Sequence, residues 1–168
     1  MFKPIDYHTL NFDPFHKIGK DWLLISARKD GITNTMTASW GALGHLWNKD
    51  IAIVFIRPQR YTKGFIDASG EFTLTFFDGH QDELLYIGSN SGEDVPDKIE
   101  KAGLTLTHVD GKPTYEEGKY MLVCKILYRQ VQKPENFMDP AFAEETFPDH
   151  DYSVMYIAEI EAAYELVK

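Results

Sequence analysis

Apolar and polar side chains alternate along several short stretches, a pattern typical of β-strands with one buried face. The alternation is clearest over residues 71–77, which we expect to form a half-buried strand, and again over 153–165. The longest run without a strand breaker is 119–132. Residues 51–56 are apolar throughout, which predicts a strand buried on both faces.

Glycine and proline mark where these strands turn or end. Asp30-Gly31 is a strong turn dipeptide between two strand-like runs, 22–28 and 32–40, so it predicts a hairpin. The segment 41–44 then reads as a glycine-marked loop. Arg57-Pro58 ends the apolar strand before it, because proline has no N–H for a sheet.

Helical signals are short and fall between the strands. Thr62 can cap a helix that closes at Gly70. Further short helices are expected at 81–87, before Gly103, and as one turn at 141–145. The other segments are expected to be an irregular arm at 1–20, a strand at 104–109 and a turn at 110–113. About seven strands with a few inserted helices favour a mainly β fold, an antiparallel barrel.

Composition bounds the class of protein. The 168 residues, 43% of them hydrophobic, suit one domain spanning 1–168 with a substantial core. A formal charge of −9 argues against nucleic acid or an anionic membrane as partner, because both require a basic surface. It permits a local anion site, since screening confines fields to about 8–10 Å. Without an apolar run of about 18 residues or a leader-like start, we expect a soluble cytoplasmic protein.

Most catalytic and metal motifs are absent. The chain has no phosphate-binding glycine motif of the Rossmann or P-loop type and no nucleophile elbow. Its six histidines are dispersed, and its single cysteine, Cys124, reads as a buried structural thiol. We read Asp149-His150-Asp151 as a short polar loop and predict no metal site.

Two arginines flank a proline turn and predict an anion site. Arg57 and Arg60 follow a buried strand, and Thr62 opens the next helix. Guanidinium groups and helix N-terminal N–H groups both suit a phosphate. An ordinary surface turn is the alternative.

A strand end, Thr35 to Trp40, is the candidate for holding a planar ring. Its backbone offers alternating N–H and C=O groups, and Thr37 and Ser39 add hydroxyls. Met36, Ala38 and Trp40 would supply apolar surroundings. The alternative is a hairpin strand packed through Met36 and Trp40.

Five sequence blocks occur together in a fixed order. They are NTMTASWG at 34–41, RPQRYT at 57–62, FTLTFF at 72–77, GSNSG at 88–92 followed by Asp94 and Lys98, and MYIAEI at 155–160. Taken together, the blocks resemble the flavin reductase-like family, close to its flavoredoxin branch. The resemblance covers about 22–161 and implies an FMN-binding split barrel, antiparallel and Greek-key-like.

The resemblance also implies roles for particular residues. In the family the ring is lined at the positions of Met36, Thr37, Ala38 and Ser39. Phosphate and ribityl would be held by Arg57, Arg60, Tyr61 and Thr62. Ser89, Ser91 and Lys98 would close the site from the loop side, with a solvated helix start as the alternative for Lys98.

A function follows from the resemblance. It implies a homodimer with FMN near the subunit interface, and flavin chemistry that needs no catalytic side chain. NADH or NADPH would pass hydride to the flavin, and a small molecule or redox protein would accept the electrons. Two alternatives stay open: an electron-transfer or flavin-storage protein without NAD(P)H activity, and a β-barrel that binds another small ligand.

Overall fold

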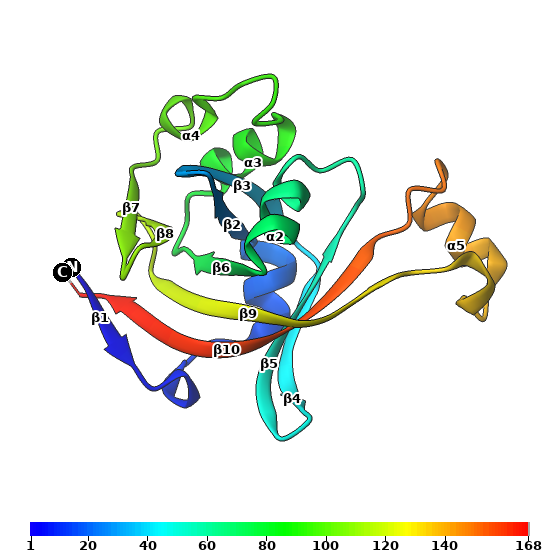
Figure 1. Ribbon diagram of the computed structural model, residues 1–168, viewed down its shortest axis with the longest axis horizontal. Helices are drawn as coiled ribbons and strands as arrows, with labels where there is room; N and C mark the ends of the chain where they lie inside the picture. Colours follow the sequence, from blue (N-terminus) through cyan, green and yellow to red (C-terminus); the bar gives the residue numbers. More distant parts are fainter. Residues whose placement is uncertain (168) are drawn as a thin grey trace.

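The computed structural model describes residues 1–167 (Figure 1). The strands are β1 Phe2–Ile5, β2 Leu23–Lys29, β3 Ile32–Ala38, β4 Gly41–Leu46, β5 Lys49–Ile56, β6 Glu71–Phe76, β7 Leu106–Val109, β8 Lys112–Tyr115, β9 Tyr120–Val131 and β10 Val154–Leu166. The main antiparallel sheet has the order β3-β2-β6-β9-β10-β5-β4, with β1 paired to β10. β7 and β8 pair separately. The predicted mainly β fold is confirmed.

Short helices lie between the strands. They are η1 Tyr7–Thr9, α1 Pro14–His16, η2 Lys17–Asp21, α2 Thr62–Ser69, α3 Gln81–Ser89, α4 Lys98–Lys101, η3 Pro134–Asn136 and α5 Pro140–Thr146. The predicted helices therefore occur. Thr62, however, does not cap α2: it is the first residue of the helix, and Tyr61, the N-cap residue, makes no side-chain capping hydrogen bond. Gly70 and Gly103 follow α2 and α4 with φ of 71° and 86°, the left-handed conformation that glycine adopts at helix ends. Within residues 1–167, no helix has the length and apolar character needed to cross a membrane.

The predicted hairpin joins β2 to β3. Asp30 and Gly31 have φ of 51° and 79°, as a two-residue hairpin turn requires. In this register Ile25 lies opposite Met36 and Leu23 opposite Ala38. Because β3 is the last strand at one end of the sheet, its other edge has no strand partner among the described residues. That edge later forms a wall of the candidate site.

Two burial predictions need correction. The 71–77 strand is buried on both faces, because β8 covers its polar face: Thr73 donates to the carbonyl of Pro113 at 2.7 Å, and Thr75 bonds Thr114 at 3.0 Å. In β5, by contrast, Phe55 stays partly exposed where the strand borders a cavity. Cys124 is fully buried as predicted, and burial raises the pKa of its thiol.

Three predicted loops contain strands. Residues 41–44 are part of β4, where a Cβ on Gly41 would lie 2.9 Å from the carbonyl oxygen of Ile53, so the close pairing with β5 requires glycine. The turn at 110–113 is confined to Asp110-Gly111, and Pro113 continues into β8. The N-terminal segment 1–20, which we expected to be irregular, contains β1, and the pairing with β10 stabilises this strand.

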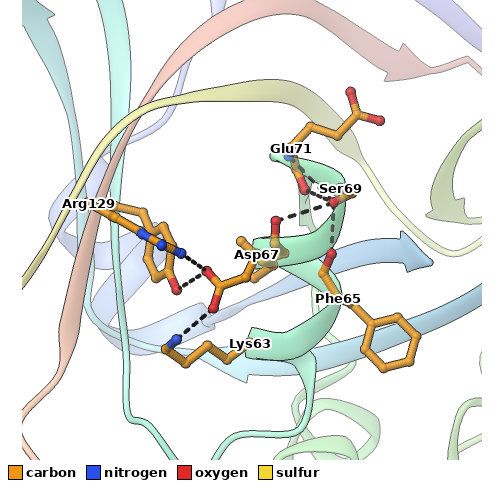
Figure 2. Close-up of polar contacts among 8 residues, drawn as sticks. Lys63, Phe65, Asp67, Ser69, Glu71 and Arg129 are labelled. Atoms are coloured by element: carbon orange, nitrogen blue, oxygen red, sulfur yellow. Dashed lines mark hydrogen bonds and ion pairs between the residues drawn. The ribbon is translucent and has the colours of Figure 1, made fainter.

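Helix α2 is fixed to the sheet by a carboxylate. Figure 2 shows Lys63 and Arg129 converging on Asp67, at 2.6 and 3.1 Å. The hydroxyl of Tyr156 donates to the same carboxylate at 2.7 Å. Since Arg129 and Tyr156 come from β9 and β10, the start of α2 and the arginine turn before it have a defined position.

A long connection projects from the barrel. β9 and β10 continue past the other strands, and residues 132–153 join them through η3 and α5, which lie away from the barrel in Figure 1. We call 132–153 the arm. Its last part returns to the barrel beside Arg57, where it contributes to the candidate site.

Candidate functional site

A cavity of about 350 Å³ opens where β3 ends and the chain leaves β5. Among the predicted residues that line it are all those from Met36 to Trp40, together with Arg57 and Arg60. Phe55, Gln59 and Ser153 complete the lining. The structure thus brings the predicted ring segment and the predicted anion turn to one cavity.

Arg60 connects the edge of β3 to the end of α3. Its Nη1 donates to the carbonyl of Gly88 at 3.0 Å, and its Nη2 donates to the carbonyl of Thr37 at 3.2 Å. Within residues 1–167 no carboxylate lies within ion-pair distance of this guanidinium. The pKa of Arg60 is lowered, mainly by burial and to a smaller extent by repulsion from Arg57. A cation with carbonyl partners alone is suited to receive an anion.

Lys98 places a second cation close to Arg60. Its side chain is 3% exposed, and its ammonium donates to the carbonyls of Ile87 and Asn90 at 3.2 and 2.7 Å. Burial, with repulsion from Arg60, lowers its pKa to about 8. The described part of the chain offers it no carboxylate either. We call Arg60, Lys98, the β3 edge and the 88–92 loop the inner wall.

The glycine loop packs directly against β3. A Cβ on Gly92 would lie 2.0 Å from Oδ1 of Asn34, and one on Gly88 would lie 3.1 Å from Cβ of Thr37. Asn34 in turn donates to the hydroxyl of Thr62 at 2.8 Å. The loop and the start of α2 therefore meet at one buried amide.

The hydroxyl groups of several predicted residues are engaged elsewhere. Thr37 donates to the carbonyl of Leu84, which ties β3 to α3. Thr35 faces away from the cavity and donates to the carbonyl of Ile25 at 3.1 Å. Thr62 accepts from Asn34, Tyr61 packs on Phe65, Ser89 donates to Leu85, and Ser91 accepts from Glu93. None of Thr35, Tyr61, Thr62, Ser89, Ser91 or Lys98 is among the residues that line this cavity, so Lys98 and the serines of the 88–92 loop belong to the inner wall only through their contacts beyond the lining.

Arg57 lines the same cavity and lies close to two aromatic rings. Its guanidinium carbon is 5.6 Å from the ring centre of Trp40 and 5.2 Å from that of Phe147. Nη1 donates to Oδ2 of Asp151 at 3.2 Å, and Nη2 donates to the carbonyl of Thr146 at 3.4 Å. We call Trp40, Arg57, Phe147 and Asp151 the outer wall.

The arm supplies residues that the sequence reasoning missed. Asp151 belongs to the tripeptide read as a polar loop, and the structure shows that it accepts from Gln59 at 2.6 Å as well as from Arg57. The hydrogen bond from Gln59, with the nearby charge of Arg57, lowers its pKa. Phe147 and Ser153 lie about 90 residues from the arginine turn, so no local pattern connects them with it.

Two buried oxygen atoms beside the cavity have no hydrogen-bond partner among the described residues. They are Oγ of Ser153, which belongs to the cavity lining, and Oδ1 of Asp151. Buried polar atoms are normally paired, so an unpaired hydroxyl on a lining residue, Ser153, fits a site for a polar ligand. No cluster of metal-ligating residues occurs in the described chain.

Comparison with known proteins identifies the fold. No protein-family model and no curated protein matches the chain. Among solved structures, the FMN-binding domain of a flavin reductase-like enzyme from Shewanella baltica has a TM-score of 0.70 and 21% identity over 98% of this chain and 77% of that one. Flavoredoxin from Methanosarcina acetivorans has a TM-score of 0.67 and 21% identity, over 87% of this chain and 68% of that one.

A third similar structure is an NADH:FAD oxidoreductase from Streptomyces globisporus, solved in complex with NAD and FAD fragments. It has a TM-score of 0.65 and 11% identity, over 87% of this chain and 74% of that one. The chain therefore has the split-barrel fold of flavin reductase-like proteins and flavoredoxins, as predicted.

Proposed function

We propose that this protein binds FMN in the cavity between the two walls and acts as an NAD(P)H-dependent oxidoreductase. The observation that carries the proposal is the inner wall: two cations, half-buried Arg60 and buried Lys98, hold carbonyl partners and no carboxylate within the described chain. A phosphate would supply the missing negative charge. The shared fold supports flavin as the ligand, because two of the similar proteins are named for FMN binding or as flavoredoxin.

The cavity fits such a ligand in size and chemistry. Its volume of about 350 Å³ lies within the range of about 300–1,000 Å³ usual for ligand sites. Met36 and Ala38 provide apolar surface, and the unpaired hydroxyl of Ser153 provides a polar atom. Arg60 would hold the phosphate, and Lys98 would add positive charge behind it. The unpaired edge of β3 offers backbone groups for the ring.

When bound, FMN supplies the hydride and electron transfer itself. The residues around the cavity then bind and orient. Arg60 fixes one end, and the apolar side chains of the inner wall keep water away from one side. Trp40 and Phe147, at the outer wall, border the approach of a second planar substrate. The final acceptor is a small molecule or a redox protein.

The direct test begins with the protein as purified. We expect a yellow protein, or a colourless one that takes up FMN with the absorbance and fluorescence changes of a bound flavin. Oxidation of NADH and NADPH is then followed with and without added FMN. Arg60→Ala should lose FMN affinity, whereas Arg28→Ala, at the exposed end of β2, is the matched control.

Each outcome separates the alternatives. A protein that binds FMN but oxidises neither nucleotide would be an electron-transfer or storage flavoprotein of the flavoredoxin type. A protein that takes up no FMN would overturn the proposal and leave a barrel for another small ligand.

The proposal extends to assembly and location. A homodimer with flavin near its interface is supported by the apolar side chains that the arm exposes, such as Met138 and Phe142 at 92% and 56%. Sedimentation of a monomer at micromolar concentration would contradict it.

A cytoplasmic location is supported by the unpaired cysteine, since reducing compartments keep thiols free.

A further inference from the structure

Arg57 and Arg60 belong to one turn but have unlike surroundings. Arg60 is held by carbonyls alone at the inner wall, whereas Arg57 already has a carboxylate partner, Asp151, at 3.2 Å. Gln59 donates to the same carboxylate oxygen at 2.6 Å, so the carboxylate is itself fixed in place. Of the two arginines, only Arg60 lacks a negatively charged partner within the described chain, so it would be stabilised more by a bound anion.

The position of Arg57 is that of a recognition group at the entrance. Its side chain is 36% exposed, and the rings of Trp40 and Phe147 lie within 5.6 and 5.2 Å of the guanidinium carbon. A guanidinium carries five N–H donors, and the two hydrogen bonds to Asp151 and Thr146 leave others unused. Aromatic neighbours and a fixed carboxylate hold such a group ready for a ligand from outside.

A second hollow adjoins the cavity at this point. It measures about 430 Å³ and shares Ser39 and Trp40 with the cavity between the walls. Phe15, Ile18 and Leu43 give it a mainly apolar lining. Arg57 lies beside Trp40, which lines both the cavity and this second hollow, the groove beside Trp40. A cation in this position suits a ligand whose planar rings are joined through phosphates.

We propose that Arg57 binds a phosphate of the reduced nicotinamide nucleotide and that the FMN phosphate depends on Arg60. Asp151 is then a positioning residue, because it acts by holding Arg57, and the groove beside Trp40 takes the rest of the nucleotide. This inference rests on the proposed function, since it assigns the second substrate of that site.

The test compares two hydride donors on the FMN-loaded protein. NADH carries phosphates, whereas 1-benzyl-1,4-dihydronicotinamide has the same reacting ring without them. In Arg57→Ala the KM for NADH should rise by about 10- to 100-fold, the usual effect of losing a hydrogen bond to a charged group. We expect kcat to change by less than about 3-fold, and both the FMN Kd and the KM for the phosphate-free donor to stay within about 3-fold.

Further variants protect the test against a folding defect. Arg57→Lys keeps the charge without the planar fork and should give an intermediate KM for NADH. Arg57→Gln removes the charge but keeps a polar side chain with more of the original length than alanine, and should resemble Arg57→Ala. Asp151→Asn should raise the KM for NADH while leaving that for the phosphate-free donor unchanged, and Arg28→Ala should change neither. Thermal melting curves show which variants are folded.

Four results would overturn the inference, and they can be told apart. If Arg57→Ala weakens FMN binding as much as Arg60→Ala does, Arg57 serves the flavin phosphate. If the KM rises equally for both donors, Arg57 does not recognise a phosphate of the nucleotide. If the wild-type protein binds FMN and oxidises no nucleotide, this inference fails while FMN binding stands. Failure to bind FMN at all overturns both proposals.

Discussion

The inner and outer walls of the cavity present the same functional group in opposite settings. At the inner wall Arg60 is half-buried, has carbonyl partners and lies next to Lys98. At the outer wall Arg57 is partly exposed, paired with Asp151 and flanked by rings. Sequence proximity therefore does not give the two arginines one role.

The contrast shows how partners decide what a cation can bind. Burying a charge is costly unless it is paired, so an arginine and a lysine with carbonyl partners gain most from an anionic ligand. An arginine that is already paired with a carboxylate is stabilised less by an anionic ligand, because its charge is already balanced. We therefore expect a permanent anion at the inner wall and a transient one at the outer wall.

The largest expected effect comes from Arg60→Ala. Removing the inner-wall guanidinium takes away the bridge between Gly88 and Thr37 and, in our proposal, a charge-assisted partner of the FMN phosphate. We expect FMN affinity to fall by about 100-fold or more, from a loss of about 2–3 kcal/mol. Titration of flavin fluorescence measures it. Arg57→Ala is the comparison, and we expect it to weaken FMN affinity by about 3-fold or less. If both variants lost FMN affinity equally, the two walls would not be functionally distinct.

Gly92→Ala should have the next largest effect. The added Cβ would meet Oδ1 of Asn34 at 2.0 Å, and Asn34 cannot move away easily because it is buried and donates to Thr62. We expect the free energy of unfolding to fall by about 1–3 kcal/mol, measured by urea denaturation.

Gly64→Ala is the matched control for that substitution. Gly64 lies in α2 with no atom within 4 Å of an added Cβ. Alanine there should raise the free energy of unfolding by about 0.5–1 kcal/mol, since it is the better helix former. A neutral Gly92→Ala would show that the 88–92 loop does not need to pack on β3.

Local patterns in the sequence predicted the fold more completely than they predicted the site. The Asp30-Gly31 turn, the alternation at 153–165 and the Gly70 end of α2 are short-range features, and the structure contains the corresponding elements. The strand β4 was missed because Gly41 and Gly44 resemble loop residues until β5 is seen beside them.

The arginine turn and the end of β3 were predictable, and the contribution of the arm to the outer wall was not. The 34–41 and 57–62 segments suggested a cavity from their own residue types, and the structure brings both to it. Asp151 and Phe147 lie far along the chain, and their contacts with Arg57 depend on the path of the arm. Partners that tertiary folding alone brings together leave no periodic signal in a single sequence.

Lys98 predicts a pH dependence that belongs to the inner wall. Its pKa is lowered to about 8, first by burial and then by Arg60. In the free protein the Lys98 ammonium loses its proton as the pH rises through that value. In the FMN complex the negative charge of the phosphate would raise the pKa of Lys98 and keep its ammonium protonated to higher pH. FMN affinity should therefore fall above pH 8, by up to about tenfold per pH unit.

The phosphate of FMN does not complicate this profile, because its second ionisation lies near pH 6. Fluorescence titrations between about pH 7 and 9.5 record the dependence. Lys98→Met should remove it and bind FMN more weakly at pH 7. A flat profile for the wild-type protein would mean that Lys98 only caps the end of α3, through the carbonyls of Ile87 and Asn90.

The smallest expected effects concern the hydroxyls beside the β3 edge. Thr37→Val removes the hydrogen bond to Leu84 and should lower the free energy of unfolding by about 0.5–1.5 kcal/mol. Ser39→Ala changes an exposed residue and should leave stability within about 0.5 kcal/mol. Both should keep FMN affinity within about 3-fold, because the β3 backbone, and not these side chains, faces the ring in our proposal. Measurement of both Kd values decides the point: a larger loss in Ser39→Ala than in Arg60→Ala would place the main flavin contacts on side chains at the end of β3.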